Sequence, residues 1–221
     1  MNIKDARNVM VLAPHPDDEV LGCGGSLAWH AQLGASISVV YMTSGEAAGV
    51  CYDEEKTIGQ IREQEASKGA SYLGITDLHF LRHKDGELEY SSPSVRQLVN
   101  LIGQLQPEIV YAPHAGESHP DHRICHALAR AAVVQAGKSR KPAGSVPPWE
   151  VRLLLGYEIW SPLSAYNNVM DITEFIDLKL QALSCHRSQQ LDYDQAIAGL
   201  NRYRGVTSGK GAFCECFYQY L

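Results

Sequence analysis

Apolar residues along the chain follow two alternating patterns. Short and nearly continuous apolar runs are typical of strands that are buried on both faces of a sheet. Such runs predict strands over Asn8–Ala13, Ser36–Met42, Leu78–Leu81, Ile109–Ala112 and Val151–Ile159. Between these runs, apolar residues recur at helical spacing, and a glycine or a proline follows several of the segments. The segments predict helices over Glu19–Leu33, Lys56–Leu73, Val95–Leu105, Pro120–Ala136 and Asp171–Ser184.

The order of these elements predicts the fold class. Strands that alternate with helices are typical of an α/β fold, in which helices cover both faces of a mostly parallel sheet. The stretch richest in Gly, Pro and basic residues, 137–149, is predicted to be a surface loop, and a further strand is expected around Cys214 and Cys216. With no internal repeat and no long linker, we expect residues 1–221 to form one domain.

Composition and charge exclude several classes of protein. The chain has 221 residues, of which 45% are hydrophobic and 20% charged, and its formal net charge is −6. A negative chain argues against a nucleic-acid partner and against a polybasic membrane-surface protein. No apolar stretch reaches the roughly 18–20 residues of a membrane span. Charges within the first ten residues and six scattered cysteines indicate a cytoplasmic protein with reduced thiols.

Two loops that follow predicted strands concentrate polar chemistry. Residues 13–19 read APHPDDE, and residues 113–122 read PHAGESHPDH. A proline followed by acidic residues favours a helix N-terminus, which explains most of the first loop without any function. It does not explain His15 or two adjacent aspartates. In the second loop, one helical turn would bring His119 and His122 to one face, although two solvated histidines at a helix entry have the same spacing.

The expected sheet order brings the two loops together. In a sheet wound 3-2-1-4-5, the strands that precede these loops are neighbours at the switch point. His15 and Asp18 would then face His119 and His122 across a cleft. Two imidazoles and a carboxylate suit a catalytic zinc ion with an open position for water, and ferrous iron suits such a ligand set as well. A free carboxylate beside that water can act as a general base.

At these residues the chain resembles the PIG-L/LmbE-like family of zinc-dependent de-N-acetylases. The motifs that carry the resemblance are His15–Glu19, Gly22–Ala28, Thr43–Glu46, Ile61–Gly74, His119–His122, Tyr157–Pro162, Asp171–Lys179 and His186–Gln189. The resemblance implies a Rossmann-like (LmbE-like) three-layer sandwich. It also implies a hydrolase that removes the acetyl group from an N-acetylated amino sugar, of the N-acetylglucosamine type, or from its conjugate. Several family members form trimers or hexamers, so a homo-oligomer is among the expectations.

The resemblance also implies a role for each site residue. The zinc ligands would be His15, Asp18 and His122. Asp17 would be the general base, and His119 would stabilise the oxyanion and protonate the leaving amine. Asp121 would orient His119, and Arg62 would contact the substrate.

Several other residues are candidates for a functional or a structural role. Trp160 would either stack on a sugar ring or belong to the core, and His186 would line the cleft. His126, one turn after His122, is either a fourth ligand or a histidine on the helix surface. The glycines in 22–25 lack the spacing of a dinucleotide loop, so they favour close packing of helix on sheet. Asp85, which precedes a glycine, is expected to form a tight turn.

Three functions fit these residues. They are deacetylation of an amino sugar, hydrolysis of a non-sugar amide by the same chemistry, and metal-dependent binding without catalysis. Asp17 argues against the last of them, because a binding module has no need for an acid that is not a ligand.

Overall fold

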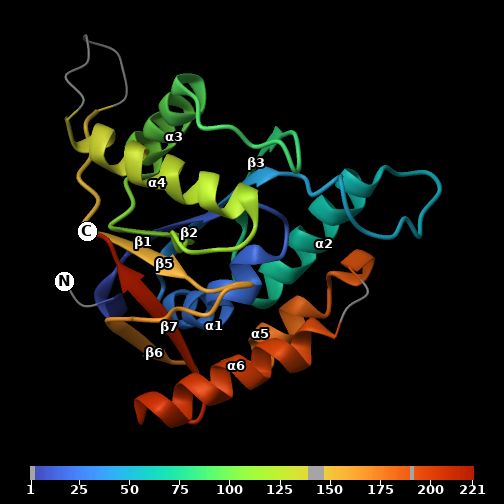
Figure 1. The fold of residues 1–221 in the computed structure, drawn as a ribbon, viewed down its shortest axis with the longest axis vertical. Coiled ribbons are helices and arrows are strands. Elements are labelled where there is room, and N and C mark those ends of the chain that lie inside the picture. The colour runs from blue at the N-terminus through green and yellow to red at the C-terminus, as the bar shows by residue number, and fades with distance from the viewer. Residues whose placement is uncertain (1–2, 139–146, 190–191) are drawn as a thin grey trace.

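The computed structural model describes residues 3–138, 147–189 and 192–221. Within them, seven strands form one sheet in the order β3-β2-β1-β4-β5-β7-β6 (Figure 1). The strands are β1 (Asn8–Ala13), β2 (Ser36–Thr43), β3 (Asp77–His83), β4 (Ile109–Pro113), β5 (Leu153–Tyr157), β6 (Asn168–Asp171) and β7 (Cys214–Gln219). The first five are parallel and follow the predicted order 3-2-1-4-5, while β7 runs antiparallel to both β5 and β6.

Helices cover both faces of the sheet, which confirms the three-layer α/β prediction (Figure 1). One face carries α1 (Asp18–Gln32), α2 (Ile58–Tyr72), α5 (Ile176–Leu183) and α6 (Tyr193–Ser208). The other face carries α3 (Ser92–Leu105) and α4 (Pro120–Lys138). Short 3₁₀ turns cover η1 (Ile3–Asp5) and η2 (Arg187–Gln189). None of the described helices is both long and apolar enough to cross a membrane.

The continuous apolar runs of the sequence arise because the central strands are buried on both faces. In β1, Val9 and Val11 pack into the core beneath α1, while Met10 and Leu12 pack into the core beneath α3 and α4. Successive side chains of a strand point to opposite faces, so both sets must be apolar when helices cover both sides.

The glycines near the start of α1 permit the close packing that the sequence predicts. A Cβ atom at Gly22 would lie 2.1 Å from the Tyr157 ring, and one at Gly25 would lie 2.7 Å from Ile172. The main-chain N–H groups of Gly25 and Ser26 donate to the buried carboxylate of Glu215. These donors therefore hold the helix against β7.

The predicted elements differ from the observed ones mainly in the last third of the chain. The helix predicted over 171–184 is wrong at its start, because Asp171 ends β6 and α5 begins at Ile176. Neither β6 nor α6 was predicted: β6 is a short edge strand, and α6 buries few of its residues. The loop predicted over 137–149 is described only at its ends, since α4 continues to Lys138 and residues 139–146 lie outside the described residues.

The pairing of β1 with β4 brings the two polar loops to one edge of the sheet. Val9 pairs with Ile109 and Val11 pairs with Tyr111, in parallel. The segments that follow Ala13 and Pro113 therefore leave the sheet side by side, at the carboxyl ends of the strands.

Candidate active site

The loop after β1 turns sharply at Asp17. This residue has φ 126° and ψ −25°, a region that costs a non-glycine residue about 1–3 kcal/mol. Its carbonyl accepts hydrogen bonds from Val20 and Leu21, and its N–H donates to Oε2 of the buried Glu19 at 3.2 Å. The Asp17 side chain makes no capping bond to α1. Helix capping therefore does not account for this acid.

Asp18 joins the two loops. It is the first residue of α1 and is buried. Its Oδ2 accepts a hydrogen bond from the main-chain N–H of His15 at 2.9 Å and lies 3.0 Å from His15 Nδ1 and 3.4 Å from His122 Nε2. Burial raises the pKa of Asp18, but His122 and His15 outweigh that effect and hold this pKa well below its usual value. A single carboxylate oxygen thus stands between two imidazoles.

His122 is fully buried in the first turns of α4, and neither nitrogen of its ring makes a hydrogen bond to the described residues. Burial lowers the pKa of His122, but Asp18 outweighs it and raises this pKa to about 9. Buried polar atoms in native proteins nearly always make hydrogen bonds, so an imidazole that makes only long contacts to carboxylates, beside a second imidazole, fits a divalent cation.

Each of the two histidines has carboxylates behind it. His15 Nε2 lies 2.9 Å from Asp85 Oδ1 and 3.3 Å from Asp121 Oδ2, and His122 Nδ1 lies 3.4 Å from Glu117 Oε2. A metal-binding histidine almost always directs its second ring nitrogen to such a group, which fixes the tautomer and the ring orientation. The surroundings of His15 and His122 therefore match those of ligands.

His119 stands beside both ligand candidates. Its ring centroid lies 4.9 Å from that of His15 and 4.9 Å from that of His122, and its side chain is half-buried. Its Nδ1 accepts a hydrogen bond from the Asp121 main-chain N–H at 3.2 Å, so a neutral ring carries its proton on Nε2. Burial, followed by the charges of His15 and His122, lowers the pKa of His119. The neutral imidazole can donate from Nε2.

The Asp121 carboxylate has other partners. It accepts hydrogen bonds from the main-chain N–H groups of Gly86 and Leu88 and lies against His15. The predicted link between Asp121 and His119 is thus made by the main chain, while the side chain supports His15.

Arg62 lies behind the candidate base. It is buried on α2, and its guanidinium donates to the carbonyl groups of Pro16 at 2.8 Å and Gly45 at 3.0 Å. The same group reaches Asp17 Oδ2 at 3.3 Å. Burial raises the pKa of Asp17 to about 7, against the opposing effect of Arg62. The guanidinium thus fixes the loops after β1 and β2 and orients Asp17.

The two remaining predicted residues differ in exposure. Trp160 follows β5 and is 42% exposed, so it is not a core residue. His186 is buried, and neither of its ring nitrogens has a partner among the described residues. It packs on α2, where a Cβ atom at Gly69 would lie 3.2 Å from His186 Nε2. Burial lowers the pKa of His186 to about 3.

Sequence reasoning missed Glu117. Its Oε1 accepts hydrogen bonds from Ile159 and Ser161, and its Oε2 accepts one from Trp160 and faces His122. The sequence does contain a signal for Glu117, because this acid lies in the same loop as His119 and His122. The residue connects a ligand candidate to the segment after β5.

Asp85 was also missed as a site residue. The turn expected from the sequence is present, with Gly86 at φ 77°, but the Asp85 carboxylate is buried against His15. His126 is not on the helix surface as expected: it is buried, and its Nδ1 lies 2.9 Å from the Pro113 carbonyl oxygen. Its ring packs against Tyr220, with the ring centroids 4.5 Å apart.

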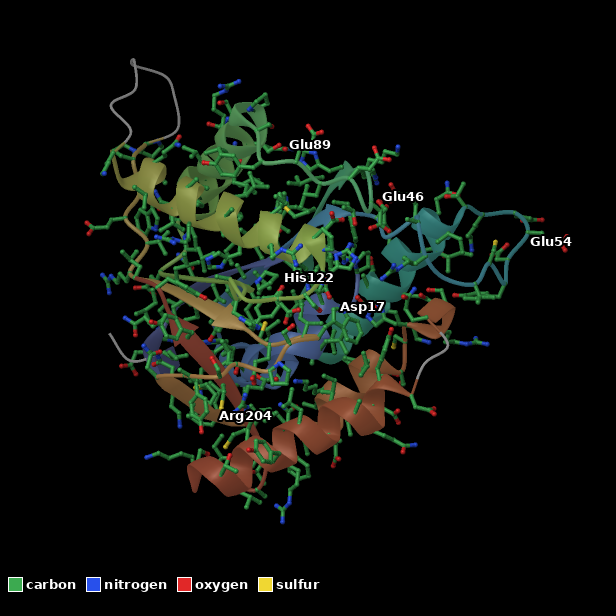
Figure 2. All side chains as sticks on the ribbon, viewed as in Figure 1. Asp17, Glu46, Glu54, Glu89, His122 and Arg204 are labelled. Carbon is green, nitrogen blue, oxygen red and sulfur yellow. The ribbon has the colours of Figure 1, made fainter. Side chains whose placement is uncertain are left out.

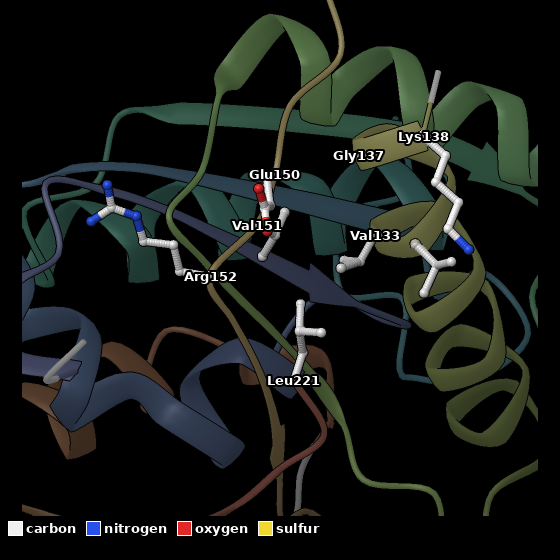
Figure 3. Close-up of a pocket in the computed structure, with 8 residues that line it drawn as sticks. Val133, Gly137, Lys138, Glu150, Val151, Arg152 and Leu221 are labelled. Carbon is white, nitrogen blue, oxygen red and sulfur yellow. The ribbon is translucent and has the colours of Figure 1, made fainter. Parts of the chain in front are cut away.

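The site lies at the carboxyl edge of the sheet, where Figure 2 shows Asp17 and His122 close together near the starts of α1 and α4. A hollow of about 820 Å³ lies at the opposite edge (Figure 3). Its lining comprises Val133, Val134, Gly137, Lys138, Glu150, Val151, Arg152 and Leu221. These residues include no histidine or cysteine.

Known proteins are similar to this chain over the region that holds both loops. The model of the PIG-L family, described as GlcNAc-PI de-N-acetylase, matches residues 10–133. The diacetylchitobiose deacetylase of Thermococcus kodakarensis is 30% identical over 196 residues, which cover 84% of this chain and 71% of that protein.

Two solved structures have a fold similar to that of this chain. A conserved protein of Thermus thermophilus superposes with a TM-score of 0.87 at 32% identity, covering 97% of this chain and 94% of that one. The N,N'-diacetylchitobiose deacetylase of Pyrococcus horikoshii also has a TM-score of 0.87, at 29% identity, covering 98% and 85%.

Proposed function

This chain belongs to the PIG-L family of de-N-acetylases, and from that premise we propose that it is a metal-dependent amidohydrolase that releases acetate from an N-acetylglucosamine-type amino sugar or its conjugate. The observation that carries the proposal is the convergence of His15, Asp18 and His122 beside Asp17, a buried acid that is not among the proposed ligands. A metal-dependent binding module needs only the three ligands, whereas a hydrolase also needs a fourth group, Asp17, that accepts a proton.

The proposed metal ligands are His15, Asp18 and His122, and the proposed ion is zinc, with ferrous iron suited to the same donors. His15, His119 and His122 also bring their ring nitrogens within 4.8 Å of one another. We favour Asp18 over His119 because its Oδ2 contacts both other ligands, and because His119 has a separate use as a donor. When bound, the cation supplies a Lewis acid that polarises the amide carbonyl and makes water more acidic.

Asp17 is the proposed general base. A carboxylate whose pKa lies near neutrality can accept a proton from the attacking water and still release it later. A nearby cation would lower this pKa, in the same direction as Arg62. Arg62 and the strained backbone hold the acid toward the site instead of toward the end of α1.

His119 is the proposed donor to the oxyanion. As water attacks the acetamide carbon, the C–O bond forms and negative charge develops on the carbonyl oxygen. The Nε2–H of His119 donates to this oxygen, and the orientation of the ring is held from Nδ1 by the Asp121 main chain. The proton taken up by Asp17, or one from His119, then passes to nitrogen as the C–N bond breaks, giving acetate and an amine.

The substrate class rests on the family and on the relative that acts on diacetylchitobiose. Both descriptions concern the acetamide of a glucosamine unit. The exposed Trp160 at the same edge of the sheet supports a ligand with a ring to stack on.

The proposal is tested by measuring acetate release from N-acetylglucosamine, N,N'-diacetylchitobiose and N-acetylcyclohexylamine, with metal content determined on the same sample. We expect release from at least one sugar, loss of release on treatment with a chelator, and recovery on adding zinc. Release from the cyclohexyl amide alone would identify an amidase for non-sugar amides. Metal and sugar binding without acetate release would identify a binding module.

A further inference from the structure

Trp160 and Tyr193 form an aromatic pair at the mouth of the site. We infer that this pair is the platform on which the pyranose ring of the substrate lies, which makes Tyr193 a specificity-determining residue. The inference rests on the proposed function and names the part of the chain that selects a sugar over other acetamides.

The two rings come from distant segments and meet at the surface. Trp160 follows β5, whereas Tyr193 is the first residue of α6. Their centroids lie 5.0 Å apart with the planes tilted by 54°. Trp160 is 42% exposed, while Tyr193 packs against the edge of the core on the α1 side and is only half-buried, so part of the pair stays accessible.

The tryptophan side of the pair is fixed to the metal site. The Trp160 main-chain N–H donates to Glu117 Oε2 at 3.3 Å, and the same carboxylate oxygen lies 3.4 Å from His122 Nδ1. One buried acid therefore sets the position of a proposed ligand and of the platform together.

The tyrosine side of the pair lies near α2, the helix that carries Arg62. Tyr193 lines a pocket of about 250 Å³ together with His186, which packs on Gly69, two turns along α2 from Arg62. Arg62 in turn contacts Asp17. Burial, then the charge of Asp17, raises the pKa of Tyr193, and Arg62 opposes them. The platform thus extends from the segment after β5 to the α2 side of the site.

The chemistry of this corner suits a sugar. A pyranose ring presents C–H groups on its faces and hydroxyl groups around its edge, so it stacks on aromatic rings while its edge needs polar partners. Arg187, Asp192 and Asp194 line the pocket beside Tyr193 and can bond those hydroxyl groups. An acyclic acetamide has neither a ring face to stack nor a rim of hydroxyl groups, so it would gain little from this surface.

Steady-state kinetics of Tyr193→Ala, Tyr193→Phe and Trp160→Ala test the inference. For N,N'-diacetylchitobiose, Tyr193→Ala and Trp160→Ala should each raise KM about tenfold and leave kcat within about twofold, because stacking is kept from ground state to transition state. Tyr193→Phe should restore KM, since it keeps the ring. The double variant should lose less than the product of the two single effects. Metal content should not change.

A fall in kcat at constant KM, or equal losses with an acyclic amide such as N-propylacetamide, would overturn the inference. Binding is measured separately by titrating N-acetylglucosamine and following tryptophan fluorescence. Of the three tryptophans, Trp29 packs on Phe175 and Trp149 bonds the Pro107 carbonyl, so the change should disappear in Trp160→Phe. A change that needs Trp160 in a protein that releases no acetate would refute the proposed function and leave the platform standing. Acetate release with no such change, and with normal KM in Tyr193→Ala, would do the reverse.

Discussion

The two edges of the sheet differ in the residues that they gather. The amino edge has a pocket of about 820 Å³ between the end of α4, the approach to β5 and the last residue of the chain (Figure 3). The carboxyl edge collects the histidines and acids of the two polar loops. Loops that leave neighbouring parallel strands at this edge converge, whereas the amino edge receives the ends of helices. The candidate site therefore lies where the parallel strands end, and not in the pocket at the amino edge.

Buried histidines show the same contrast. His122 lies against Asp18, which raises its pKa to about 9 despite burial. His30, on α1, is buried without a carboxylate, and burial lowers its pKa to about 4. Similar burial thus has opposite effects on the two pKa values, because His122 faces a carboxylate and His30 does not.

The largest effect is expected from removing a proposed ligand. His122→Ala should lose the bound metal, and acetate release should fall to background, because no remaining group takes its place opposite His15. The matched control is Lys138→Ala at the amino edge, which should keep full metal content and activity. Metal analysis and acetate release on both purified proteins, with melting curves to confirm folding, provide the measurement. Full metal content in His122→Ala, or an equal loss in Lys138→Ala, would remove the distinction between the edges.

Asp17→Asn should have the next largest effect. Its amide cannot accept the proton, so kcat should fall about 100–10,000-fold while metal content stays unchanged. The partly exposed acid Asp53, which lies outside the site and pairs with Lys56, serves as the control when replaced in the same way. Wild-type kcat in Asp17→Asn would show that another group is the base.

His119→Ala should lower kcat about 100–1000-fold, the usual result of removing one donor to an oxyanion. Metal should be retained, because the ring nitrogen of His119 is not needed as a ligand in the proposed set. Loss of metal from this variant would instead favour the set of His15, His119 and His122.

Glu117→Gln should have a smaller effect, on two properties at once. Metal affinity should fall about 10–100-fold, as is typical when the acid behind a metal-binding histidine is removed. KM for a sugar should rise as well, since the same carboxylate holds Trp160. Competition with a chelator and steady-state kinetics measure the two. If neither metal affinity nor KM changed, Glu117 would support neither the metal site nor Trp160.

The last prediction concerns stability and leaves activity unchanged. The folded pKa of His30, about 4, lies below its unfolded value of 6.5, so the unfolded chain binds an extra proton between these values. The free energy of unfolding should therefore fall as pH drops through this window, by about 3 kcal/mol from this group. Urea unfolding at several pH values should show a shallower decline in His30→Gln, and an identical decline would show that His30 does not carry this dependence.

The sequence by itself determined the parallel core and the identity of the reactive groups. Continuous apolar runs such as Asn8–Ala13 require cover on both faces, and this requirement fixes strand and helix alternation without any long-range information. The HPDDE and HPDH motifs likewise indicated which loops to join, because their neighbouring strands followed from the winding order.

Only the tertiary structure decided which side chains support the reactive groups of the two motifs. Asp85 lies in a turn that looked purely local, yet its carboxylate meets His15 across the sheet edge. Arg62 binds main-chain carbonyls and Asp17, and Tyr193 reaches Trp160 from a helix that the sequence pattern did not reveal. Periodicity reports which face of an element is buried, but contacts between distant loops depend on where the strands end and how the helices cross them. Those positions are set by the packing of the whole chain.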